Sequence, residues 1–234
     1  MKRSQINTAI AHAEAMLAEY RFALPPFASW SRQDWAARHD ASGEIRRAGL
    51  GWDITDFGQG RFDELGLTLF TIRNGDAANL GTGKPSVGPL GMVYAEKVII
   101  VKDGQRCPMH YHFIKTEDII NRGGGVLAIE LVETGPDGKA DTSRDVVVRT
   151  DAMERRFPPN GILRLHPGES VTLTPGLAHA FWAEGGDVFV GEVSTVNDDK
   201  TDNAFLEPVA RFPGIQEDVA AHRLIVGDYD ALDQ

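Results

Sequence analysis

The sequence contains a single cysteine, Cys107, so the chain cannot form an internal disulfide bond. It has no apolar run of about 20 residues, the length that a membrane-spanning helix needs. The first residues have neither a long apolar core nor a small-residue cleavage site, so we expect no signal peptide. A lone thiol suits a reducing compartment, and we therefore expect a cytoplasmic protein.

Basic residues are fewer than acidic ones. The chain has 24 Lys and Arg against 34 Asp and Glu, which gives a formal net charge of −10 at pH 7. No basic run is present, so general binding to a phosphate backbone or to an anionic membrane surface is disfavoured. We expect a small-molecule partner, with no nucleic acid and no membrane.

Length and composition fit one globular unit. The 234 residues are 42% hydrophobic and 25% charged, which is ordinary for one large domain. Residues 1–50 carry apolar side chains at helical spacing until Pro25 interrupts the pattern. We expect Ser4 to cap this helix and Ser31 to cap a shorter one. The prediction is a helical extension over 1–50, packed on a β domain over 51–234.

From Trp52 onward, apolar side chains alternate over short segments, as they do in half-buried strands. Such segments, recurring at about ten-residue spacing, favour a mainly β sandwich or barrel. The expected strands cover 65–71, 94–101, 126–132, 145–150, 161–165, 171–174, 180–183 and 188–196. Glycine and proline predict a loop over 74–90. In the tail we expect a strand over 206–211 and a helical turn over 218–222.

A compact group of metal-ligand residues lies within 104–125. His110 and His112 are two positions apart, so on a strand both imidazoles point to the same face. Glu117 follows at an odd step, which requires a turn, bulge or bend if all three side chains are to meet. Two imidazoles and a carboxylate suit a divalent transition metal, although an isolated His-x-His pair more often lies at a surface or in a core.

A second motif, GESVTLTPGLAHAFW over 168–182, supplies His179. Together the two motifs resemble the cupin signature. The first fits throughout, while in the second Pro175 directly precedes Gly176, where the usual pattern leaves one residue between them. The resemblance implies a jelly-roll barrel, and the absence of an internal repeat indicates a single one. The ligands that the resemblance implies are His110, His112, Glu117 and His179.

Longer stretches are more specific than the cupin motifs. The chain resembles the D-lyxose isomerase family in LPPFASWS, LGWDITDFG, YAEKVIIV, HYHFIKTEDIINRGGG, GLAHAFWAE and GEVSTVNDDKTDNAFLEP. The resemblance covers nearly the whole chain, with differences at the loop over 77–89 and at Tyr111. It implies a homodimeric, Mn²⁺-dependent aldose–ketose isomerase that interconverts D-lyxose and D-xylulose, and also D-mannose and D-fructose.

Isomerising an aldose to a ketose moves a proton between C2 and C1, so an acid and a base must lie near the sugar. Lys115 lies two positions before Glu117 and would face the same way on an extended segment, unless it is a solvated lysine at the rim. A nearby cation would favour its neutral form. Glu192 lies within an apolar strand, as an active-site group or as an ion-pair partner of Arg122 or Lys97. We predict that Lys115 and Glu192 are catalytic, with their individual roles unassigned.

Four further residues are candidates for binding the sugar. Asp199 and Asp202 form a polar group after the strand that bears Glu192, and would bind hydroxyls or form a solvated turn. Lys97 alternates with a glutamate along its strand, so one of these two side chains faces inward. Trp182, beside the second metal motif, would cover the apolar face of a sugar or pack in the core.

Two other functions use the same ligand set. An Fe²⁺-dependent cupin dioxygenase also suits three histidines and a glutamate, but oxygen chemistry does not require Lys115 and Glu192. A non-enzymatic sugar-binding cupin would need no complete set of ligands with charged neighbours. The sequence therefore favours the isomerase, and an oxygen-uptake assay would separate it from the dioxygenase.

Overall fold

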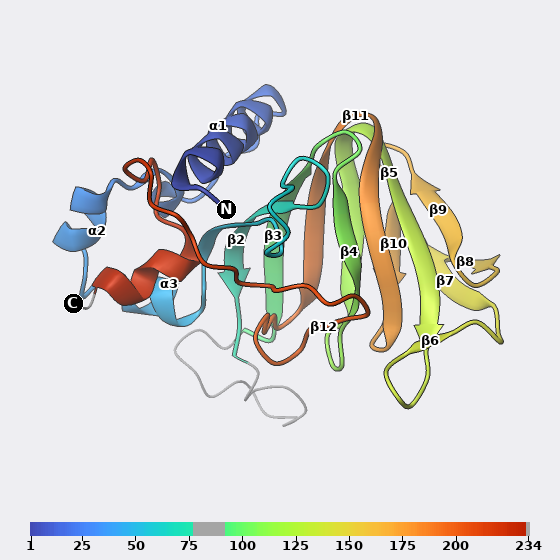
Figure 1. The fold of residues 1–234 in the computed structure, drawn as a ribbon. Helices are drawn as coiled ribbons and strands as arrows, with labels where there is room; N and C mark the ends of the chain where they lie inside the picture. Colours follow the sequence, from blue (N-terminus) through green and yellow to red (C-terminus); the bar gives the residue numbers. More distant parts are fainter. Residues whose placement is uncertain (77–91, 233–234) are drawn as a thin grey trace.

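A computed structural model describes residues 1–76 and 92–232, and most of the expected loop lies outside these residues. Helices come first in the chain and gather at one end of the molecule (Figure 1). They are α1 (Arg3–Glu19), the 3₁₀ turn η1 (Pro26–Ser29), α2 (Arg32–Ala37) and α3 (Gly43–Arg47). None of the described helices combines the length and apolarity needed to cross a membrane.

Strands make up most of the remaining chain, which confirms the mainly β prediction. The first strands are β1 (Gly51–Thr55), β2 (Leu67–Asn74), β3 (Tyr94–Val101), β4 (Arg106–Tyr111), β5 (Glu117–Thr134) and β6 (Ala140–Asp141). They are followed by β7 (Val146–Thr150), β8 (Met153–Phe157), β9 (Gly161–Leu165), β10 (Ser170–Leu173), β11 (Leu177–Thr195) and β12 (Ala204–Phe205). A last 3₁₀ segment, η3, covers Val226–Leu232.

Two long strands, β5 and β11, join the two layers of the fold. The second half of β11 pairs with β3, and through it with β2 and β1. Its first half pairs instead with β4, which in turn pairs with β12. The partners of β5 also change along its length, from β10 to β9. One antiparallel sheet thus folds over on itself and resembles the jelly-roll barrel that the cupin motifs predicted.

A glycine-rich bend lets the long strands change layers. The register between β5 and β11 shifts between Glu184 and Val188, opposite Gly124. Gly124 has a φ of +98°, and a Cβ atom there would lie 2.0 Å from the carbonyl oxygen of Asp187. Only glycine fits this position. The sequence predicted separate strands here because turn residues usually separate strands, whereas in the structure the chain continues through the bend.

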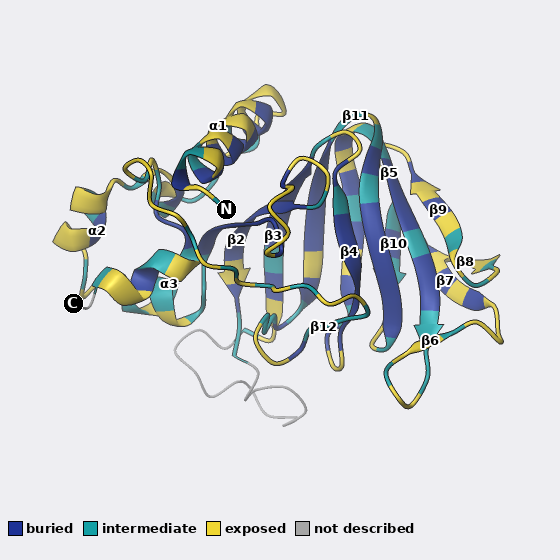
Figure 2. Ribbon diagram, viewed as in Figure 1, coloured by how far each residue is buried: buried dark blue, intermediate teal, exposed yellow. Residues whose placement is uncertain are grey.

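The core lies between the two layers (Figure 2); burial alternates along β7 and β9, whereas β1 and β2 are buried almost throughout. Leu127, Ile129 and Leu131 on β5 face Leu163 and Leu165 on β9, and all five are fully buried. Burying one such side chain contributes about 1.5–3 kcal/mol relative to leaving it exposed. The metal-ligand residues lie in this same interior, so the core fixes their positions.

The helical region packs on the sheet together with the C-terminal tail. The apolar stripe of α1, including Ile6 and Ile10, contacts side chains of β1 and β2. Ser31 caps α2 as predicted, but Ser4 lies inside α1, and its hydroxyl donates to Asp218 over 2.7 Å. The domain boundary at residue 50 stays a prediction.

Two predictions for the tail were wrong. Residues 218–222 are irregular, because the tail bonds to α1: the side-chain amide of Asn7 donates to the carbonyl of Ala220, and its oxygen accepts from the His222 amide. Residues 206–211 are also irregular, and the strand of this region is the shorter β12, before them. The backbone conformation of the tail therefore depends on long-range contacts and does not follow from the local sequence pattern.

Candidate metal centre and active site

Strand pairing brings the three histidines of the two motifs together. His110 lies on β4 directly opposite His179 on β11, and His112 follows at the end of β4. Their ligand atoms all lie within 4.8 Å of one another, and all three side chains are buried. The sheet register therefore creates a cluster from residues that are distant in the sequence.

The turn required by the odd spacing of Glu117 is present between β4 and β5. The carboxylate of Asp202 accepts the backbone N–H groups of Ile114 and Lys115 over 2.7 Å and 2.9 Å. The turn directs Glu117 into the cluster, where its Oε1 atom lies 3.1 Å from Nε2 of His179 and 3.7 Å from Nε2 of His112.

Each histidine has its Nδ1 atom beside a backbone carbonyl. These oxygens belong to Pro108 for His110, Asp202 for His112 and Leu177 for His179, at 2.8, 2.6 and 3.1 Å. Since a carbonyl only accepts, Nδ1 donates the proton in each case, which leaves Nε2 as the ring atom that can bind a metal ion. Nε2 of His179 faces the carboxylate of Glu117, so a cation between them would have a ligand atom on each side.

Protonation states agree with a ligand set. Burial and the neighbouring histidines lower the pKa of His110 well below its ordinary value, and burial lowers the pKa of His112 to about 4. Burial would raise the pKa of Glu117, but the nearby ammonium of Lys115 holds it well below its usual range. Neutral imidazoles and an ionised carboxylate are the forms that bind a metal ion. The residues present therefore fit a divalent cation.

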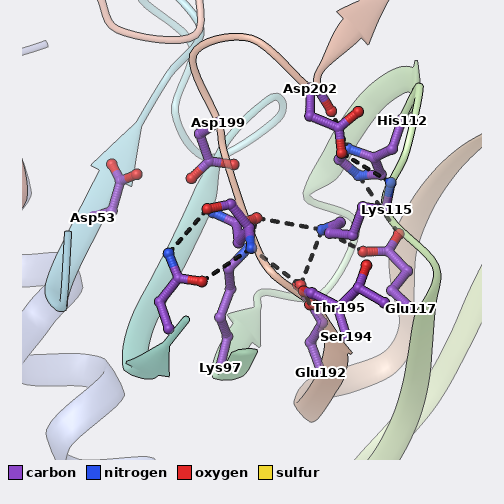
Figure 3. A network of polar contacts seen from close by, with 12 residues as sticks. Asp53, Lys97, His112, Lys115, Glu117, Glu192, Ser194, Thr195, Asp199 and Asp202 are labelled. Carbon is purple, nitrogen blue, oxygen red and sulfur yellow. Dashed lines mark hydrogen bonds and ion pairs between the residues drawn. The ribbon is translucent and has the colours of Figure 1, made fainter. Parts of the chain in front are cut away.

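Beside this cluster lies a buried network of ion pairs (Figure 3). The Nζ atom of Lys115 lies 2.6 Å from Oε2 of Glu117 and 3.0 Å from Oε1 of Glu192. The Nζ atom of Lys97 lies 3.2 Å from the same Oε1 atom and donates to Oδ1 of Asn197 over 2.6 Å. Glu192 thus forms the expected ion pair with Lys97, while its active-site role stays a prediction.

The network fixes the charges of its members. Burial would lower the pKa of Lys115, but Glu117 and Glu192 outweigh burial and raise it. Burial would raise the pKa of Glu192, but Lys115 and Lys97 lower it. Lys115 is therefore an ammonium group in this structure, in contrast to the neutral form expected beside a cation, and Glu192 is a carboxylate.

A cavity of about 40 Å³ adjoins both groups of residues. Its polar wall includes the metal-ligand residues with Lys97, Lys115 and Glu192, and its apolar wall includes Phe181 and Phe205. Asp199 also lines the cavity, and attraction to Lys97 and Arg211 outweighs burial to keep its pKa low.

Two sequence candidates lie apart from the cavity wall. The side chain of Asp202 holds the turn before Glu117, and its carbonyl accepts from His112. Trp182 follows Phe181 on β11 and so points to the opposite face, where its indole contacts Arg106 and donates to Glu184 over 3.1 Å. The aromatic side chain in the cavity is Phe181.

Comparison with known proteins gives the family. A family model described as D-lyxose isomerase matches residues 1–229. The chain belongs to the D-lyxose isomerase family. It is 44% identical over 232 residues to a D-lyxose/D-mannose isomerase of Escherichia coli O157:H7, covering 98% of each chain. It is 43% identical over 240 residues to a protein of the same name from Serratia proteamaculans, again covering 98% of both.

Solved structures share the fold at lower sequence identity. The L-ribose isomerase of Acinetobacter sp. DL28 in complex with L-ribose has a TM-score of 0.59 and 16% identity, over 90% of this chain and 94% of that one. The ligand-free L-ribose isomerase of Cellulomonas parahominis has a TM-score of 0.57 and 17% identity, over 94% and 98%. The predicted sugar isomerase is confirmed at the level of the family, in preference to the dioxygenase and the sugar-binding module.

Sequence reasoning missed several polar residues of the site in this family member. Asn197 accepts from both Lys97 and Lys115, and Arg211 lines the cavity with its Nη2 atom 2.5 Å from Oδ2 of Asp53. Asn197 lies in the irregular stretch after β11 and Arg211 in the one after β12, where no periodicity indicates which side chains face inward. The one available signal was a cationic side chain at 211 within a partly apolar stretch.

Proposed function

We propose that this protein interconverts D-lyxose and D-xylulose, and also D-mannose and D-fructose, by proton transfer between C2 and C1. The observation that carries the proposal is the contact between Lys115 and Glu192, 3.0 Å apart and beside a buried cluster of three histidines and a glutamate. The relatives named D-lyxose/D-mannose isomerase, which match nearly the whole chain, support the choice of sugars.

Four residues would hold the metal ion, for which we propose Mn²⁺. They are His110, His112, Glu117 and His179, which together offer three imidazoles and one carboxylate. When bound there, the cation would supply Lewis acidity to the sugar oxygens. Lys115 contacts the other oxygen of Glu117 and orients this carboxylate, as groups around metal ligands commonly do.

We assign the role of base to Glu192. Its pKa is lowered by Lys115 and Lys97, so it is ionised and able to accept the proton from C2. The same carboxylate then returns the proton to C1, because the two carbons are adjacent. Lys115, which its raised pKa keeps protonated, gives a proton to the carbonyl oxygen at C1 and recovers one from the hydroxyl at C2 as the ketose carbonyl forms there. This proton route passes through an enediolate.

Lys97 and Asp199 are the sequence candidates that we retain for substrate binding, because both line the cavity. Lys97 also keeps Glu192 charged through a contact of 3.2 Å. Asp202 acts through the turn before Glu117, and we leave Trp182 out of the proposed site because of the direction of its side chain.

The decisive experiment is to strip the protein of metal, reload it with Mn²⁺ and incubate it with D-lyxose. We expect D-xylulose to form from D-lyxose, and D-lyxose to form when D-xylulose is supplied instead. D-Mannose and D-fructose should interconvert in the same way. The metal-stripped protein is the control and should be inactive until Mn²⁺ is restored. Oxygen uptake is measured in parallel and should be absent. Failure of the Mn²⁺-loaded protein to convert either aldose would refute the proposal.

We further propose that the protein is a cytoplasmic homodimer. Its single cysteine, Cys107, supports this location, because a chain without an internal disulfide suits a reducing compartment. The family resemblance supports the dimer. Light scattering coupled to size-exclusion chromatography tests it, because a dimer has twice the 25.6 kDa mass of one chain.

A further inference from the structure

Two polar atoms on the cavity wall lack a hydrogen-bond partner among the described residues. They are Nη1 of Arg211, a donor, and Oδ1 of Asn203, an acceptor. Both atoms are buried, so neither is simply solvated at the surface. An unmade hydrogen bond of this kind usually indicates a missing ligand or water, because desolvating a polar group without a partner is unfavourable.

Arg211 is held in place by its other contacts. Its Nη2 atom lies 2.5 Å from Oδ2 of Asp53 and 3.3 Å from Oδ2 of Asp199, and only 9% of its side chain is exposed. Asp53 and Asp199 lie on the far side of Lys115 from His112 and Glu117 (Figure 3). Two carboxylates therefore hold the planar guanidinium through Nη2 and leave Nη1 without a partner on a residue that lines the cavity.

Asn203 approaches the cavity from a different direction. It directly precedes β12, whose Phe205 pairs with His110 on β4. Its position is therefore coupled to the metal-ligand strand, whereas that of Arg211 is coupled to β1 through Asp53. A ligand that meets both atoms would extend from the metal-ligand cluster across the cavity.

We propose that Arg211 and Asn203 determine substrate specificity by binding hydroxyl groups of the open-chain sugar at C3, C4 or C5. A hydroxyl both accepts and donates a hydrogen bond, so sugar hydroxyls suit Nη1 of Arg211, a donor, and Oδ1 of Asn203, an acceptor. The reacting carbons C1 and C2 belong beside Glu192 and Lys115, which leaves the more distant hydroxyls for this pair. The inference rests on the proposed function and extends it.

Such a pair selects for a hydroxyl more strongly than an apolar pocket could. A site that hydrogen-bonds a substrate hydroxyl rejects the analogue without it, because the buried polar groups are left unpaired. The proposed pair should therefore discriminate against a sugar that is deoxygenated at the matching carbon. We expect this deoxygenation to lower kcat/KM by about 10²-fold or more in the parent protein.

The test combines these sugars with two variants. Arg211→Lys keeps a positive charge between Asp53 and Asp199 but cannot present a second nitrogen to the cavity. Asn203→Ala removes the acceptor and breaks no ion pair. The control is Arg164→Lys, since Arg164 is half exposed and pairs with Glu184 outside the site. Metal content and thermal unfolding are checked for every variant before kinetics are compared.

For each protein, kcat/KM is measured with D-lyxose and with its analogues deoxygenated at C3, C4 or C5. We expect the parent and Arg164→Lys to lose about 10²-fold on one analogue, and Arg211→Lys and Asn203→Ala to lose less than about 10-fold on the same one. The proposal is overturned if the two site variants retain the full parental discrimination on every analogue. If Arg211→Lys does not fold, Asn203→Ala decides.

Binding without turnover separates this inference from the reaction itself. D-Arabinitol, the open-chain reduction product of D-lyxose, is titrated calorimetrically into the metal-loaded proteins. We expect both site variants to bind it about 10-fold or more weakly than the parent and Arg164→Lys do. Should the parent bind the polyol with this dependence yet convert no aldose, the subsite stands and the proposed reaction fails. Equal binding by all four proteins would overturn the subsite.

Discussion

The Nζ atom of Lys115 lies 3.0 Å from Oε1 of Glu192, although the two residues are 77 positions apart in the chain. Each is buried, and each stabilises the charged form of the other. A donor and a base are thus held side by side next to the metal-ligand cluster. Replacing either side chain removes no metal ligand. The contribution of the pair to catalysis can therefore be measured separately from metal binding by the cluster.

The first prediction concerns this pair. Lys115→Met and Glu192→Gln should both keep the metal but lower kcat by about 10²-fold or more, the usual contribution of an acid or base. Metal content and steady-state kinetics measure the two effects separately. Lys102→Met is the control, because Lys102 is partly exposed and pairs with Asp63 on the surface. A site variant with the parental kcat would remove that residue from proton transfer.

The second prediction concerns His179, the ligand on β11. His179→Ala should lose bound metal and activity together, because the remaining ligands all come from the other motif. The matched control is His166→Ala, at an exposed position where the imidazole has no role in the cluster. Elemental analysis of the purified proteins measures the metal. Full occupancy together with unchanged turnover in His179→Ala would exclude it from the ligand set.

A third prediction separates the two roles considered for Asp202. Its carboxylate holds the turn before Glu117, so Asp202→Ala should weaken metal binding by about 10-fold or more. With saturating metal, the KM for D-lyxose should change much less. Competition with a fluorescent chelator measures the metal affinity. A raised KM at unchanged metal affinity would instead support the original prediction that Asp202 binds the sugar.

The fourth prediction tests the proton route. In deuterium oxide, a carboxylate that exchanges its proton with solvent should introduce deuterium at a carbon of the product. We expect partial incorporation, since Glu192 is buried and its exchange competes with return of the proton to the sugar. Mass spectrometry and proton NMR of the ketose measure it. If carbon-bound deuterium is absent over many turnovers at several pH values, the assignment of a solvent-exchangeable base is withdrawn.

A fifth prediction concerns the attachment of the tail. Arg3 is 2% exposed, and its Nη2 atom lies 2.6 Å from Oε1 of Glu217 and 2.7 Å from Oδ1 of Asp228. Arg3→Met should lower the free energy of unfolding at pH 7 by about 1–3 kcal/mol, less than for a fully buried pair because Glu217 is exposed. Chemical denaturation measures it. Arg61→Met, at an exposed ion pair with Glu64, should change stability by less than about 0.5 kcal/mol.

The same contact should depend on pH in a defined direction. The hydrogen bond from Arg3 lowers the pKa of Glu217 below its ordinary value of 4.5. A depressed carboxyl pKa stabilises the folded state above the unfolded pKa, and this contribution is lost as the pH falls through the folded pKa. The difference in stability between the parent and Arg3→Met should therefore be full at pH 7 and shrink below about pH 4.5. A difference that grows in acid would contradict this account.

The sequence predicted the parts of the site that depend on local spacing. His110, His112 and Glu117 lie in one short segment, so the strand period and one turn suffice to bring them together. Glu192 was recognisable because a carboxylate within an apolar strand needs a partner. These predictions use the strand period and the cost of burying an unpaired charge. Both can be applied to a short stretch of sequence without knowing the fold.

The residues that the sequence could not assign depend on distant partners. Arg211 is directed by Asp53 and Asp199, and nothing near position 211 in the sequence indicates such contacts. The tail over 218–222 has helical spacing, but its bonds to α1 leave the backbone irregular. The direction of Trp182 follows from the face of β11 that bears His179, which becomes known only with the register. Tertiary contacts overrode local pattern in each case.

The long pairing of β5 with β11 has a consequence for the order of folding. Ser194 pairs with Glu117 and Leu177 with Glu133, so the two strands meet only after a long intervening loop has closed. A slip of one residue would turn His179 away from His110, because neighbouring side chains point to opposite faces. We therefore expect a metal ion to bind late in folding. It would stabilise the native register over shifted ones, since only chains with the native register offer a complete set of ligands.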